Sequence, residues 1–179
     1  MKIILTEPDC NWFKVIKGVN ETVYVDCSNK PAFKIIELYG KKYIFDLERK
    51  RERRRLNFPL IYNIYNIGAV RNSKRKKTIV FVETEKEADK INKKSKTLVA
   101  TTVCELSNRI ELSRNVLELF RDTNIIVALS KHNTDENVHV PITSQLCKVA
   151  KNIDVYNYAT DDVEYFSKEQ CRIAKILCW

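Results

Sequence analysis

Residues 78–91 read Thr78-Ile-Val-Phe-Val-Glu-Thr-Glu-Lys-Glu-Ala-Asp-Lys-Ile91, and this stretch decides the fold. Its apolar first part predicts a short buried strand that gives way to charge at Glu83. Thr84 and Glu87 have the spacing of a capping box, which predicts that a helix starts at once. The stretch therefore places a carboxylate at the carboxyl end of a buried strand, where open α/β sheets bind ligands.

Strands and helices alternate through the rest of this part of the chain. Apolar segments at 97–101, 124–129 and 153–158 predict three further strands. Apolar residues at helical spacing predict helices before residue 120, after Pro141 and from Ser167 onward. Continuous apolar strands that alternate with amphipathic helices indicate an α/β domain over residues 78–179, with a mostly parallel sheet and helices on both faces.

Residues 1–77 predict a small β-rich N-terminal subdomain with a connecting helix. Residues that favour strands recur at 2–5, 12–16, 22–25, 33–38 and 42–47. Tyr39-Gly40-Lys41 has the composition of a hairpin turn between the last two. Leu60, Ile61, Ile64 and Ile67 recur at helical spacing, and we expect Gly68 to end that helix.

The composition disfavours several classes of protein. No run of 18 apolar residues occurs, so we expect no membrane span and no membrane partner. The apolar start is too short for a signal peptide, which predicts an intracellular protein, cytoplasmic or in the nucleus or an organelle if the source is eukaryotic or viral. The six cysteines contain no Cys-x-x-Cys pair, which disfavours a zinc site. The glycine-rich nucleotide-binding motifs are absent from the sequence.

The positive charge is concentrated in the first part of the chain. Residues 1–77 hold 18 Lys and Arg against 8 Asp and Glu, a net charge of +10. Residues 78–179 hold 14 against 15, a net charge of −1. An asymmetry of this size predicts a polyanion partner, most simply DNA or RNA.

Two basic runs supply the candidate nucleic-acid-binding residues. The first lies on and after the second strand of the predicted hairpin, and the second lies before residue 78. Contacts from such side chains are expected to be directed mainly at phosphates. The candidates are Lys41, Lys42, Arg49, Lys50, Arg51, Arg53, Arg54, Arg55, Arg71, Lys74, Arg75, Lys76 and Lys77.

Four segments form an ordered set of motifs: Pro59-Leu-Ile-Tyr-Asn63, Lys77-Thr-Ile-Val-Phe-Val-Glu83, Glu85-Lys-Glu-Ala-Asp89 and Val99-Ala-Thr-Thr102. Together they resemble the Toprim region of phage and plasmid primase-helicase proteins. The resemblance covers residues 40–170 and implies a Toprim-like α/β sheet. It also implies that Glu83 takes the position of a strand-end general acid/base or metal ligand. Thr84 stands where the family has a glycine.

The family's second motif, an Asp-x-Asp pair that holds Mg²⁺, is not intact. Matching Asn133-Thr134-Asp135-Glu136 to it keeps one carboxylate, Asp135, at a metal position. Counting from the strand end instead matches Ser130-Lys131-His132 and keeps none. Because Mg²⁺ requires several oxygen ligands, we expect a degenerate site and no cofactor, with Mg²⁺ bound by Glu83 and Asp135 only if activity survives.

Three functions remain open from the sequence. The leading hypothesis is a non-catalytic, nucleic-acid-associated protein of a replication or mobile-element system. An alternative is an active Mg²⁺-dependent primase or nuclease that uses Glu83 with Asp135. A third is a protein-interaction module that binds or inhibits a replication enzyme. Glu83 itself has a simpler alternative, a solvated strand-end acid beside a helix N-terminus. Tyr62, Tyr65, Tyr156 and Tyr158 are expected at the core or its rim, with stacking on bases as the alternative for tyrosines beside the basic runs.

Overall fold

The computed structural model describes residues 20–26, 28, 30–47, 50–53, 64–73, 78–103, 112, 114–130, 142–158 and 167–178, the side chains of 51–53 and 178 excepted. Predicted strands at 2–5 and 12–16, the predicted helical positions Leu60 and Ile61, the side chain of Tyr62 and part of the helical stretch predicted before residue 120 lie outside these residues. Within the described part of the chain, no helix has the length and apolarity needed to cross a membrane.

The second part of the chain forms a parallel sheet, as predicted. Within the described residues it has four strands in the order β6-β5-β7-β8, and every pair in it is parallel. The strands agree closely with the apolar segments of the sequence: β5 (Thr78–Phe81), β6 (Leu98–Thr101), β7 (Asn124–Leu129) and β8 (Asn152–Asn157).

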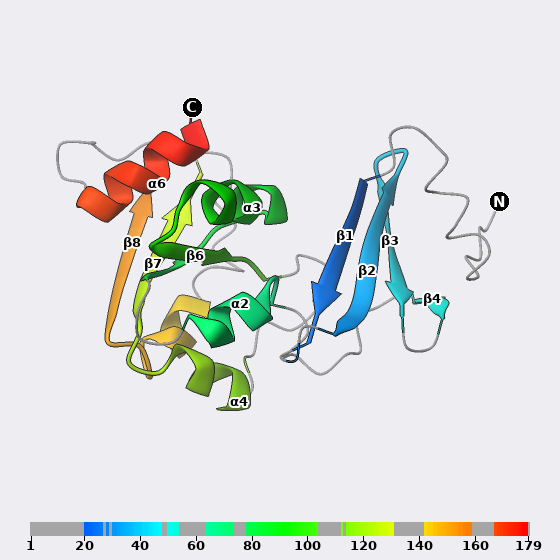
Figure 1. Cartoon of the computed structure of the whole chain (residues 1–179), viewed down its shortest axis with the longest axis horizontal. Helices are drawn as coiled ribbons and strands as arrows, with labels where there is room; N and C mark the ends of the chain where they lie inside the picture. The colour runs from blue at the N-terminus through cyan, green and yellow to red at the C-terminus, as the bar shows by residue number, and fades with distance from the viewer. Residues whose placement is uncertain are drawn as a thin grey trace.

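Helices cover both faces of this sheet, which confirms the mixed α/β class (Figure 1). One face carries α3 (Glu85–Lys94) and α6 (Lys168–Cys178). The other carries α2 (Ile67–Asn72), α4 (Arg114–Leu117) with the 3-10 turn η2 (Glu118–Phe120), and a short helix at residues 142–146. The result is three layers, with the parallel strands in the middle.

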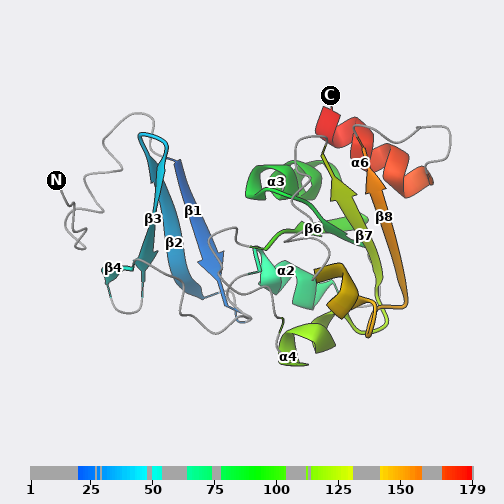
Figure 2. The same cartoon turned by 180° about the vertical axis from the view of Figure 1, so that it is seen from behind.

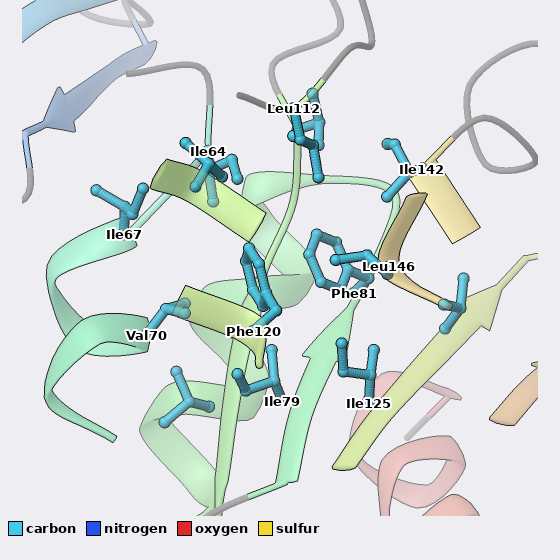
Figure 3. Close-up of a cluster of buried hydrophobic side chains, with 14 residues drawn as sticks. Ile64, Ile67, Val70, Ile79, Phe81, Leu112, Phe120, Ile125, Ile142 and Leu146 are labelled. Carbon is cyan, nitrogen blue, oxygen red and sulfur yellow. The ribbon is translucent and has the colours of Figure 1, made fainter. Parts of the chain in front are cut away.

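The alternation of strand side chains divides the core into two clusters. Ile79 and Phe81 of β5 point toward α2 and α4, and Phe81 meets Phe120 with ring centroids 5.3 Å apart (Figure 3). Val80 and Val82 point the other way, toward Ala88 and Ile91 of α3 and Ile173 of α6. A strand buried on both faces requires a continuous apolar run, which the sequence supplies.

The predicted capping box of α3 is present, and α6 begins with a second one. The Thr84 hydroxyl accepts from the Glu87 backbone N–H at 3.2 Å, and the Glu87 carboxylate accepts from the Thr84 N–H at 3.0 Å. Ser167 and Gln170 make the corresponding pair at the start of α6, at 3.2 and 2.7 Å. These bonds satisfy backbone donors of the first turn, so each helix begins where the sequence predicts.

The prediction that Gly68 ends a helix is wrong. Gly68 is the second residue of α2, which begins after Asn66 in the left-handed conformation, φ 55°. Ile64 is not helical and forms an antiparallel bridge with Val103. Ile64 and Ile67 both enter the core beneath β5, so their spacing reflects a shared buried cluster and not one continuous helix.

An antiparallel sheet precedes this domain. Its described strands follow one another in chain order: β1 (Asn20–Val25), β2 (Pro31–Leu38), β3 (Lys41–Asp46) and β4 (Arg51–Arg53). Tyr39 and Gly40 join β2 to β3 with φ of 50° and 70°. Two residues with positive φ fit the twist of a tight hairpin, which confirms the predicted turn.

One face of the antiparallel sheet meets the α/β domain. Tyr24, Phe33, Ile35 and Ile44 cluster on this face with Tyr65, a residue that also packs in the cluster beneath α3. Tyr24 stacks on Phe33 at 4.6 Å and meets the Tyr65 ring edge-on at 5.6 Å. In Figures 1 and 2, β1 is accordingly the strand nearest the α/β domain and β4 the farthest.

Candidate functional site

The candidate site lies where the order of the parallel strands reverses. From β5 the chain passes through α3 to β6 on one side, whereas β7 pairs with β5 on the other. The carboxyl ends of two such strands border the crevice in which open α/β sheets bind ligands. Glu83 lies two residues beyond β5, and Ser130 lies immediately beyond β7.

Glu83 and Ser130 contact one another directly. The backbone N–H of Ser130 donates to Glu83 Oε1 at 2.9 Å, and the Ser130 hydroxyl donates to Oε2. The Thr102 hydroxyl donates to the backbone carbonyl of Glu83 at 3.2 Å. Both carboxylate oxygens of Glu83 therefore accept hydrogen bonds from the protein itself, and both residues are half-buried.

Tyr158, which follows β8, extends this network. Its hydroxyl donates to Glu87 Oε1 at 2.6 Å. Burial is the main reason that the pKa of Tyr158 is raised well above its usual value, and the hydrogen bond and charge of Glu87 and the charge of Glu83 add to this. A bond to the Ser130 side chain acts in the opposite direction. The phenol therefore stays a neutral donor.

Two more tyrosines donate to carboxylates of α3. The Tyr65 hydroxyl donates to Asp89 Oδ1 at 2.8 Å, and the Tyr24 hydroxyl donates to Glu85 Oε1 at 2.5 Å. Burial, followed by the bond to Asp89, raises the pKa of Tyr65. Tyr24 belongs to β1, so its bond joins the antiparallel sheet to the first turn of α3.

These tyrosine contacts were only partly predicted. Tyr156 is buried and Tyr65 and Tyr158 are half-buried, which agrees with the expected core and rim positions. The bonds that Tyr65 and Tyr158 make to α3 were not predicted from the sequence. Glu85 and Asp89 are four positions apart and therefore lie on the same side of α3. Two carboxylates on one side of a helix predict that hydrogen-bond donors pack against it, and this was the signal available in the sequence.

The described residues around Glu83 do not form a Mg²⁺ centre. Among the described residues, no three His, Cys, Asp or Glu side chains are grouped so that they hold a metal ion. Glu85 and Glu87 carry the carboxylates nearest in sequence to Glu83. Both accept hydrogen bonds from tyrosines. The second predicted ligand, Asp135, lies outside the described residues.

A cavity of about 160 Å³ lies beside Glu83, between the two sheets. Residues 83–86, at the start of α3, form one wall. The other wall comes from the face of the antiparallel sheet that carries Asn20, Thr22, Ile35, Glu37 and Lys42. Ile35 is buried whereas Asn20, Lys42 and Lys86 are exposed, so the cavity opens outward from an apolar floor.

The structure describes only some of the predicted nucleic-acid-binding side chains. Lys41 and Lys42 are exposed at the hairpin turn, Lys50 is exposed beyond the far end of β3, and Arg71 is exposed in the last turn of α2. For Arg51 and Arg53 the structure gives the backbone, in β4. The remaining candidates lie outside the described residues: Arg49, Arg54, Arg55, Lys74, Arg75, Lys76 and Lys77.

The described basic residues are therefore not gathered at one point. Those of the hairpin lie at both ends of β3, whereas Arg71 belongs to the α/β domain. The structure does bring Lys42 and Glu83, predicted for different roles, to the walls of one cavity.

Comparison with known proteins adds no identity: no family model matches the chain, and no curated protein or solved structure matches it either.

Proposed function

We propose that this chain is a non-catalytic nucleic-acid-binding protein of a replication or mobile-element system. Its α/β domain would be a degenerate relative of the Toprim fold, and the basic antiparallel sheet would bind the phosphate backbone. The sequence resemblance motivates the Toprim relationship, and the parallel sheet is compatible with it.

One observation carries the non-catalytic part of this proposal: both oxygens of Glu83 accept hydrogen bonds from Ser130. A catalytic or metal-binding carboxylate must offer its oxygens to a substrate or an ion. In the registration that is counted from the strand end, Ser130 also takes the position of the family's first metal-binding Asp. The hydroxyl there supplies a donor to Glu83 in place of a second negative charge.

The charge distribution supports the binding part. Lys41 and Lys42 are exposed at the tip of the hairpin, in the half of the chain that carries the whole net positive charge. Lysine side chains in such positions neutralise phosphates and release counterions, which makes binding dependent on salt. Basic side chains on a two-stranded tip also reach a flexible single strand or a duplex with little steric hindrance.

The test is a fluorescence-anisotropy titration of a labelled single-stranded DNA at several salt concentrations. We expect log K to fall linearly with log salt, with a slope of about −0.7 for each phosphate neutralised. The double variant Lys41→Gln/Lys42→Gln should bind about tenfold more weakly at low salt and show a shallower slope, because two phosphate contacts are lost.

Two exposed lysines of α3 provide the matched control. The variant Lys93→Gln/Lys94→Gln removes the same charge from the half of the chain that is nearly neutral. It should bind like the unchanged protein. Equal weakening by the two double variants would show that net charge alone matters, and binding that ignores salt would contradict the proposal.

A further inference from the structure

The two edges of the parallel sheet are finished differently. At the β6 edge, the side-chain amide of Asn92 on α3 takes the place of a neighbouring strand. Its Nδ2 donates to the Ala100 carbonyl at 2.9 Å, and its Oδ1 accepts from the Ala100 N–H at 2.8 Å. All four residues of β6 are buried. The backbone of Ala100 is therefore satisfied within the chain, so no further strand pairs with it.

The middle of the β8 edge is open to solvent. β8 is the outermost of the four strands that the structure describes in this sheet, and it pairs with β7 along its whole length. Asp154 and Val155 are both exposed, and Val155 is 52% exposed although it is apolar. In Figures 1 and 2, β8 is the parallel strand farthest from the antiparallel sheet, which therefore does not shield it.

Val155 also directs its backbone away from β7. The N–H of Tyr158 donates to the Leu129 carbonyl at 3.1 Å, which shows that Tyr158 bonds toward β7. Successive residues of a strand direct their N–H and C=O groups to alternate sides, and the register of β8 against β7 has no shift. Because Tyr158 is three positions from Val155, the N–H and C=O of Val155 point outward.

The sequence of β8 selects a second copy of the same strand as its neighbour. When two copies of β8 meet antiparallel about a two-fold axis at Val155, each Val155 exchanges both backbone hydrogen bonds with its counterpart, and the two apolar side chains meet. Asp154 of each copy then lies opposite Tyr156 of the other copy. An axis at Asp154 would instead place two negative charges opposite each other, which is unfavourable.

We infer that two copies of this chain associate through β8 with Val155 on the two-fold axis, so that their parallel sheets become one continuous sheet. The same strand serves both copies, which is the arrangement of a closed two-fold dimer. The inference does not depend on nucleic-acid binding. A contact made mainly of one strand pair is at the small end of specific interfaces, so we expect a dissociation constant of about 10–100 μM.

Sedimentation velocity of the full chain, freed of nucleic acid, tests the association. Over about 1–300 μM protein, a range that spans the expected dissociation constant, the sedimentation coefficient should rise from the monomer value toward the dimer value. This measurement on the unchanged protein is independent of every substitution.

Charge exchange on the axis tests the geometry. Val155→Lys places two ammonium groups opposite each other, and Val155→Asp places two carboxylates there, so each variant should associate at least about tenfold more weakly. An equimolar mixture of the two variants should dimerise again, because opposite charges then meet on the axis. A residue away from the axis would not show this recovery.

Val23→Lys controls for adding a charge to an exposed valine of a strand. Val23 is 38% exposed on β1, in the other sheet. This variant should dimerise like the unchanged protein. A melting temperature close to that of the unchanged protein shows that each variant is folded.

Three outcomes would contradict the inference. A monomer at every concentration would overturn it and leave the β8 edge to a strand of another protein. A folded Val155→Lys that dimerises as the unchanged protein does would place the contact elsewhere. Loss of both homodimers without recovery in the mixture would overturn the axis at Val155. None of these results alters the test of DNA binding at the hairpin.

Discussion

The two sheets of this protein use their strand ends differently. At the carboxyl end of the parallel strands, Glu83 is held by Ser130, and the acidic residues of α3 are held by tyrosines. At the tip of the antiparallel hairpin, Lys41 and Lys42 are exposed. The edge at which α/β proteins usually bind ligands is satisfied internally, and the net positive charge lies in the part of the chain that holds the other sheet.

The largest expected effect tests whether the parallel sheet is the stable centre of the molecule. Phe120 is fully buried and packs against Phe81 beneath β5. Phe120→Ala should lower the free energy of unfolding by about 3–5 kcal/mol, because it removes buried apolar area and leaves a cavity. Urea unfolding measures this loss.

An exposed apolar residue of the parallel sheet is the control for this substitution. Val155 on β8 is 52% exposed, and Val155→Ala should cost less than about 0.5 kcal/mol. Similar losses at the two positions would mean that the core division described above is incorrect.

A smaller effect is expected where the parallel sheet holds its own carboxylate. Ser130→Ala removes the hydroxyl donor to Glu83 and keeps the backbone donor. The free energy of unfolding should fall by about 1–2 kcal/mol, since a hydrogen bond to a half-buried charged group is lost. In a Glu83→Gln background, Ser130→Ala should lower the free energy of unfolding by less. An equal cost in both backgrounds would show that the two side chains are not coupled.

The bond between the antiparallel sheet and α3 should contribute less still. Tyr24→Phe removes the hydroxyl that donates to Glu85 and preserves the stacked ring. A loss of about 1 kcal/mol is expected, because Glu85 lies beside the open cavity and regains water. Tyr39→Phe, at a hairpin tyrosine that is 89% exposed, should change nothing. Thermal unfolding of both variants provides the comparison.

Alkaline pH should weaken the tyrosine contacts gradually. The pKa values of Tyr65 and Tyr158 are raised in the folded protein, mainly by burial. Their contribution to stability is complete below the pKa of an unfolded tyrosine, about 10, and is lost as the pH rises above it. Stability should therefore decline from pH 10 upward. The stability of Tyr158→Phe should decline less steeply with rising pH. An unchanged slope would mean that Tyr158 is not the group responsible.

The architecture of the α/β domain could be predicted from the sequence because its signals are local. A strand buried on both faces requires an uninterrupted apolar run, and Ile125-Ile126-Val127 satisfies that requirement without reference to any other segment. The capping boxes are equally local, since Thr84 and Glu87 bond within one turn.

What could not be predicted depends on contacts between distant segments. Ser130 is 47 positions from Glu83, and nothing in either local sequence shows that a serine rather than a carboxylate or an ion meets the acid. Ile64 and Ile67 have helical spacing, but pairing with Val103 keeps Ile64 extended. The cavity that joins Lys42 to the start of α3 likewise exists only once the two sheets pack together.

The most direct test of the central claim is one binding experiment in the presence of EDTA and again with Mg²⁺. Three proteins are compared in their affinity for one single-stranded DNA: the unchanged protein, Glu83→Gln and Lys41→Gln/Lys42→Gln. We predict that the unchanged protein binds in EDTA, that Glu83→Gln binds within about twofold of it, and that the lysine variant binds about tenfold more weakly. Binding that requires Mg²⁺ and is lost in Glu83→Gln would contradict the account, because the carboxylate would then serve an ion and not Ser130.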